Sequence, residues 1–325
     1  MKNIKYFLIF LALVIVAVIA LNYISSKPKK AKPNPYEYNV DEFKMVDPEL
    51  IHYKETRQLK VALDDHAGLA AFNGNIFLAS NQKLTVISPN GSKINEFPIP
   101  PDARALAVNA NKIAVAYQRT IETYNHQGEL LSKTEIISDS SVFSSIALWN
   151  EKTMVADAGK RRLYGFSGAD LVLEIEGVSG AKNLHGFIVP SPYFEVSVNS
   201  ENELWCTNPG MHALQQYSEK GDLISAWDKA SLEIDGFTGC CNPAQFTTLP
   251  DGRFITSEKG MPRIKIYSME GVLESVVAAP EKFEGNQRAA ELAVIGETIV
   301  ALDFDRTMIR IFEPKASPNP SQGGE

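Results

Sequence analysis

Clusters of basic residues are missing from the body of this 325-residue sequence, and the chain carries a formal net charge of −7. No Lys- or Arg-rich helix and no series of exposed aromatic residues accompanies its apolar segments. Proteins that bind nucleic acids present a basic patch or stripe to the phosphate backbone. We therefore exclude a nucleic-acid partner.

Cysteine and histidine are also scarce, with three Cys and five His in the whole chain. Their spacing matches no zinc-binding pattern, and no nucleophile stands beside a recognisable base. The sequence therefore predicts no metal site, no cofactor and no catalytic residue.

A repeated pattern dominates what is present. Six times, an aromatic or apolar residue is followed four positions later by Gly or a small or polar substitute, between two apolar strand-like runs. The pairs are Ile87/Gly91, Tyr124/Gly128, Phe166/Asp170, Tyr217/Gly221, Tyr267/Gly271 and Phe312/Ala316. Their successive spacings are 37, 42, 51, 50 and 45 residues, which is typical of a four-stranded propeller blade. The pattern predicts an all-β, six-bladed β-propeller.

Each blade should begin with an innermost strand that is short, apolar and rich in small residues. The six candidates are GLAAF, ALAVN, SSIALW, EVSVN, AQFTTL and AELAVI. The last blade lacks a fourth strand, because the chain runs into a polar tail after MIRIFEP. We expect the segment from Arg57 to Leu63 to supply that strand and close the ring.

The N-terminus carries a second strong signal. An unbroken apolar run extends from Phe7 to Leu21, after Lys2 and Lys5. About 18 such residues can cross the hydrocarbon core as a helix. A cleaved signal peptide is the alternative, but no small-residue cleavage motif lies at the polar boundary and no lipobox cysteine is present. We expect an uncleaved single-pass anchor in a bacterial inner membrane, with the propeller in the periplasm or another extracytoplasmic space.

The expected organisation follows from these two signals. A Pro- and Lys-rich spacer should separate the helix from the propeller, and the C-terminal tail should be disordered. The predicted segments are a membrane anchor at 1–25, a spacer and lead-in at 26–46, the propeller at 47–315 and the tail at 316–325.

Binding residues should lie in the loops that lead into the innermost strands, because these lead-in loops ring one mouth of the central channel. The candidates at this rim are His66, Arg104, Tyr193, Phe194, Cys240, Cys241, Asn242 and Arg288. This rim is mixed and largely polar. We expect a protein partner or a small ligand at the channel mouth.

Adjacent cysteines in GFTGCCNPAQF stand out in a chain with so few. Cys240 and Cys241 are a candidate vicinal disulfide, which would form a strained turn in an exported domain. They are also readable as small buried hydrophobic residues, or as part of a soft-metal thiolate site with Cys206.

The repeats resemble the NHL type of six-bladed propeller over about Asp47 to Pro314. The stretches PSPYFEV, GCCNP and SEKG more narrowly resemble a group of membrane-anchored bacterial NHL-like proteins of unassigned activity. Related propeller enzymes include calcium-dependent lactonases, which imply acidic and Asn ligands at the channel, and a zinc-dependent amidating lyase, which implies several His ligands.

Three functions remain open. The resemblance and the rim favour a non-catalytic binding or assembly module. A redox or electron-transfer accessory that uses Cys240 and Cys241 is the alternative. A metal-dependent hydrolase or lyase is less favoured.

Overall fold

The computed structural model describes residues 2–25, 42–177, 186–285 and 288–316. The chain divides into two units, Met1–Val40 and Asp41–Glu325. The first contains helix α1, Lys2–Ser25, in which Asn3–Leu21 has a mean hydropathy of 2.9 and no buried part. This confirms one N-terminal apolar helix that could cross a membrane, as an anchor or as a signal sequence. Most of the predicted spacer and nearly all of the predicted tail lie outside the described residues.

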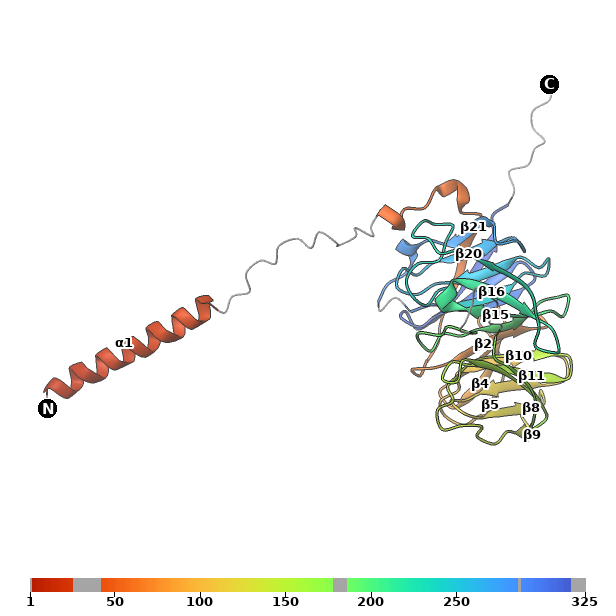
Figure 1. Ribbon diagram of the computed structural model, residues 1–325, viewed down its shortest axis with the longest axis horizontal. Coiled ribbons are helices and arrows are strands. Elements are labelled where there is room, and N and C mark those ends of the chain that lie inside the picture. Colours follow the sequence, from red (N-terminus) through yellow and green to blue (C-terminus); the bar gives the residue numbers. More distant parts are fainter. Residues whose placement is uncertain (1, 26–41, 178–185, 286–287, 317–325) are drawn as a thin grey trace, which may run out of the picture. The chain divides into compact units, whose positions relative to one another are not determined.

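The described residues of the second unit form six four-stranded antiparallel sheets and four short 3-10 turns (Figure 1). The first sheet consists of β2 (Gly68–Phe72), β3 (Asn75–Ser80), β4 (Lys83–Ile87) and β5 (Lys93–Pro98), and the second of β6 (Ala105–Val108), β7 (Ile113–Ala116), β8 (Ile121–Tyr124) and β9 (Leu130–Lys133). The third consists of β10 (Phe143–Trp149), β11 (Lys152–Asp157), β12 (Arg162–Ser167) and β13 (Asp170–Ile175), and the fourth of β14 (Val196–Val198), β15 (Leu204–Asn208), β16 (Ala213–Tyr217) and β17 (Leu223–Asp228). The fifth consists of β18 (Gln245–Thr248), β19 (Phe254–Ser257), β20 (Ile264–Tyr267) and β21 (Leu273–Ala278). The sixth contains β22 (Glu291–Ile295), β23 (Thr298–Asp303), β24 (Met308–Pro314) and β1 (Tyr53–Lys60). The 3-10 turns are η1 (Glu42–Lys44), η2 (Pro48–Leu50), η3 (Pro209–Met211) and η4 (Pro280–Lys282).

The innermost strands form a closed ring. Each contacts the next in the order β2, β6, β10, β14, β18 and β22, and β22 contacts β2. All six coincide with the predicted innermost strands to within a residue or two. The predicted six-bladed propeller is confirmed.

Ring closure also follows the prediction. β1 pairs antiparallel with β24, with Arg57 opposite Ile311 and Lys60 opposite Met308. The fully buried Arg310 of β24 fastens this pair through ion pairs of 2.8 Å to Glu55 and 3.2 Å to Asp303. The strand begins at Tyr53 and ends at Lys60, so it starts four residues before the predicted segment and ends three residues before the predicted end at Leu63.

The core lies between neighbouring blades. Each blade presents one apolar layer to the next, and Trp149 and Trp205 lie buried in two of these layers. Repeated glycines permit close packing at the outer turns. Gly271 has a φ of 81°, and a Cβ at this position would lie 2.6 Å from the ring of Trp227 in the preceding blade.

Candidate functional site

A cavity of about 150 Å³ lies at the channel mouth. Every blade contributes to its lining at or just before its innermost strand. One residue from each blade, in chain order, is His66, Arg104, Val142, Tyr193, Gln245 and Arg288. The structure therefore brings together four of the predicted rim residues: His66, Arg104, Tyr193 and Arg288.

Polar residues at the ends of second strands hold several lead-in loops in place. Asp157 accepts a hydrogen bond of 2.9 Å from the backbone N–H of Val142. The Asn208 side-chain oxygen accepts a hydrogen bond of 2.9 Å from the backbone N–H of Ile188. The Ser80 hydroxyl accepts one of 2.9 Å from the backbone N–H of Asp64. These buried acceptors satisfy loop N–H groups that would otherwise lack partners. The mouth is consequently built on backbone tied to the sheets.

Arg104 and His66 share one carboxylate at the rim. Asp102 lies 2.9 Å from His66 Nδ1 and 3.1 Å from Arg104 Nε. Within the described residues, neither Nη1 nor Nη2 of Arg104 forms a hydrogen bond. Asp102 thus orients Arg104 through Nε and leaves the end of the guanidinium available to a ligand.

Arg288 is positioned mainly by neutral groups. Its guanidinium carbon lies 4.0 Å from the centre of the Phe304 ring, and Nη2 donates to the carbonyl of Asp65 at 3.0 Å. Asp305 accepts from the backbone N–H of Arg288, and no described carboxylate forms an ion pair with its guanidinium. Arg288 therefore lines the cavity with a positive charge that no carboxylate of the described residues pairs with.

Two glutamates lie deeper in the channel. Glu291 lines both the mouth cavity and a smaller cavity of about 30 Å³ below it, which has room for about one water. Glu195 lines the smaller cavity and a further one of about 250 Å³ bounded by all six innermost strands. The two residues thus share the lining of one small cavity inside the channel.

Glu195 and Glu291 are both half-buried residues. Burial raises the pKa of Glu291 to about 8, although the Leu69 N–H, at 2.8 Å, and Arg288 both favour the charged form. Burial also raises the pKa of Glu195 well above its usual range, opposed by a hydrogen bond of 2.5 Å from Ser145. Glu291 therefore remains largely protonated at neutral pH and can donate a hydrogen bond.

Two of the predicted rim residues, Phe194 and Asn242, are buried and packed within the protein. Phe194 is fully buried between blades, with its ring 4.8 Å from that of Phe187. Asn242 is 1% exposed, and its side-chain amide bonds the backbone of Thr238 and Lys259. Neither side chain is free to bind a ligand at the rim, because burial and existing hydrogen bonds occupy both.

The adjacent cysteines are not among the residues that line the mouth cavity, and their predicted place at the channel rim stays a prediction. Cys240 is exposed and Cys241 is buried; both are free thiols, with their Sγ atoms 3.0 Å apart. Burial raises the pKa of the Cys241 thiol. The predicted disulfide is not formed in this structure, and its formation stays a prediction.

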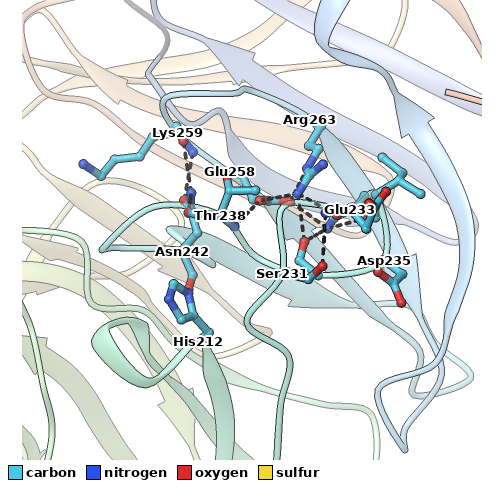
Figure 2. Close-up of polar contacts among 12 residues, drawn as sticks. His212, Ser231, Glu233, Asp235, Thr238, Asn242, Glu258, Lys259 and Arg263 are labelled. Atoms are coloured by element: carbon cyan, nitrogen blue, oxygen red, sulfur yellow. Dashed lines mark hydrogen bonds and ion pairs between the residues drawn. The ribbon is translucent and has the colours of Figure 1, made fainter. Parts of the chain in front are cut away.

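A buried polar network holds the loop that carries these cysteines (Figure 2). Glu258 Oε1 lies 2.7 Å from Arg263 Nε and 2.8 Å from Lys265 Nζ, and all three side chains are fully buried. Arg263 and Lys265 also donate to the carbonyl of Gly236 at 2.8 and 2.6 Å. Asn242 links the same loop to Lys259, as Figure 2 shows. The SEKG turn and the GCCNP loop are therefore one structural unit.

No group of three or more His, Cys, Asp or Glu residues suited to a metal ion occurs among the described residues.

No family model and no curated protein matches the chain. Solved structures do resemble it. One is virginiamycin B lyase from Staphylococcus aureus, with a TM-score of 0.55 and 15% identity, covering 82% of this chain and 89% of that chain.

Two Bacteroides proteins of unknown function are also similar. The protein from Bacteroides thetaiotaomicron has a TM-score of 0.55 and 13% identity, covering 75% of this chain and 68% of that one. The protein from Bacteroides caccae has a TM-score of 0.51 and 16% identity, covering 70% and 85%. At these identities the likeness shows the propeller fold alone, which is consistent with the resemblance to NHL-like propellers.

Glu291, Glu195 and Phe304 belong to the channel but were not predicted as site residues. A signal for the two glutamates was present, because each directly begins one of the short innermost-strand segments, ELAVI and EVSV. Phe304 gave no such signal, since its stacking on Arg288 depends on the fold.

Proposed function

We propose that this chain is a membrane-anchored, extracytoplasmic propeller that acts as a non-catalytic binding or assembly module, with a small ligand held at the mouth of its channel. One observation carries the proposal: all six blades line one cavity, and Arg104 and Arg288 are both among its lining residues. Concave sites with a few convergent polar groups are the usual form of ligand pockets. The apolar helix supports the anchor and is compatible with export.

The test is a fragment screen by fluorine NMR, using the full chain in lipid nanodiscs. His66 lines the cavity and has a side chain that is 44% exposed, so a His66→Trp variant should fold and obstruct the mouth. Lys93→Trp, on the exposed outer strand β5, is the matched control. The proposal expects fragments that bind the wild type and Lys93→Trp but not His66→Trp. A screen in which no hit responds to His66→Trp would contradict it.

A redox accessory remains a second candidate because the two Sγ atoms of Cys240 and Cys241 lie 3.0 Å apart. Disulfide closure would remove two protons and two electrons from the thiols. A disulfide-bearing protein would accept them and be reduced to two thiols. Mass spectrometry of protein isolated without reductant distinguishes this candidate: a mass two hydrogens lower supports it, and three free thiols oppose it.

A further inference from the structure

The charges that line the mouth cavity are unequal. Arg104 and Arg288 are permanently positive, and the described residues give Arg104 one carboxylate partner and Arg288 none. Asp102 pairs with Arg104 only through Nε and is shared with His66. A further cation lies beside the wall, since Lys259 Nζ is 5.4 Å from the ring centre of Tyr193. An anionic group is therefore favoured at this rim.

The floor of the cavity differs from the rim. Glu291 retains its proton at neutral pH because burial raises its pKa to about 8. It consequently adds little negative charge to compete for the arginines, and it can donate a hydrogen bond into the cavity. A ligand would then place its charge at the rim and an uncharged acceptor or apolar end below.

The volume of the cavity and the residues of its wall further restrict the chemical class of the ligand. A cavity of about 150 Å³ accommodates a molecule roughly the size of benzene. Its wall includes Ala67, Val142, Phe143, Pro192, Ala289 and Phe304. Guanidinium groups match planar carboxylates through paired N–H donors.

We propose that the channel mouth binds a small organic carboxylate, with its carboxylate held by Arg104 and Arg288 and its uncharged body against the apolar wall above Glu291. This inference rests on the proposed binding function and specifies its ligand class. The arginines at the rim favour a negatively charged ligand, and the cavity volume limits the size of that ligand. Protonated Glu291 at the floor favours an uncharged end.

Binding should weaken at alkaline pH. The titratable and charged groups around Glu291 are Glu195, Arg288, Arg104 and His66. When Glu291 ionises, its carboxylate competes with the ligand for the arginines. Glu291→Gln retains an acceptor for the Leu69 N–H and stays neutral, so a comparison with the wild type isolates this group.

The experiment is a calorimetric titration of the full chain in nanodiscs with benzoate, uncharged benzamide and inorganic phosphate. We expect benzoate to bind more tightly than the other two at neutral pH.

Arg104→Gln and Arg288→Gln should each lower the affinity for benzoate about tenfold or more, as expected for a charge-assisted hydrogen bond. Arg57→Gln, which removes an exposed arginine from β1, should leave the affinity unchanged. Raising the pH from 7 to 9 should weaken benzoate binding to the wild type but not to Glu291→Gln.

Other outcomes overturn the ligand class without overturning the site. Benzamide as tight as benzoate, or phosphate tighter than benzoate, would contradict a carboxylate while His66→Trp still abolished binding. Failure of benzoate to bind at millimolar concentration would also contradict it. Failure of the binding function itself is distinguished by the fragment screen, in which no compound would then respond to His66→Trp.

Discussion

Glu291 and Glu195 place ionisable groups in the channel, where both line one small cavity. Burial raises the pKa of both, so each contributes stability in its protonated form. A folded-state pKa above the unfolded value means that this stability is complete below the unfolded pKa. It is lost as the pH rises through the folded pKa.

Glu291→Gln should therefore change the pH dependence of unfolding. The usual value of 4.5 and the folded value of about 8 define the window in which the wild type loses stability. Near pH 8 the variant should be more stable by about 2 kcal/mol, after allowance for water in the channel, with little difference near pH 4. Urea denaturation across this range measures the effect. Glu297→Gln, at an exposed turn of the same blade, should show no such trend.

Residues at the mouth could be predicted from the sequence where their position next to an innermost strand was enough to place them. His66, Arg104 and Arg288 directly precede innermost strands, so ring geometry places them at the rim. Phe194 differs because side chains alternate faces near a strand, so Tyr193 lines the cavity while Phe194 is buried in the core. Asn242 is buried too, since its side chain bonds the backbone of Thr238 and Lys259.

At the scale of elements, β1 and β24 close the ring through Arg310. Strand counting predicted this pairing, because a blade with three strands leaves an exposed edge. The ion pairs that reinforce it were not predictable, since they require Glu55 and Asp303 to meet one buried side chain from opposite neighbours.

Arg310→Met should weaken closure. The change leaves the nearly buried Asp303 and the partly buried Glu55 without their cation, which should lower the free energy of unfolding by about 3 kcal/mol. Arg57→Gln, at an exposed position of β1, is the control and should cost little. Equal urea midpoints for wild type and Arg310→Met would contradict this role.

Glu258 has a comparable role in the unit formed by SEKG and GCCNP (Figure 2). Glu258→Gln leaves Arg263 and Lys265 buried without a counter-charge, so unfolding should become easier by about 3–5 kcal/mol at neutral pH. Burial already lowers the pKa of Lys265 to about 8. The deficit should shrink toward pH 9, since Lys265 can lose its proton there. Thermal unfolding of the variant at pH 6.5 and 9, with exposed Glu281→Gln as control, tests both statements.

At the scale of the whole molecule, the chain combines an apolar helix with a propeller. The helix and the number of blades were both predictable because each depends on periodicity or length. The cavity was not, because its size depends on how six separate loops pack around one channel.

The full chain should remain with membranes through a high-salt wash and be released by detergent. Apolar length, rather than charge, retains the helix, so salt should not displace it. Membrane fractionation followed by N-terminal sequencing provides the measurement. A mature protein that begins near Asn22 would instead identify the helix as a cleaved signal.

The central claim is that the channel mouth is a solvent-connected site that attracts anions. Ser144 lines it and is partly accessible, so a Ser144→Cys variant in a Cys240→Ser background provides a reactive reporter. Its rates with anionic and cationic methanethiosulfonate reagents of similar size should be measured in the full chain. They should be normalised to those of Ser92→Cys, at an exposed turn. If the mouth attracts anions, the normalised rate should be higher for the anionic reagent, and benzoate should protect Ser144→Cys. A higher rate for the cationic reagent, or no reaction with either, would contradict it.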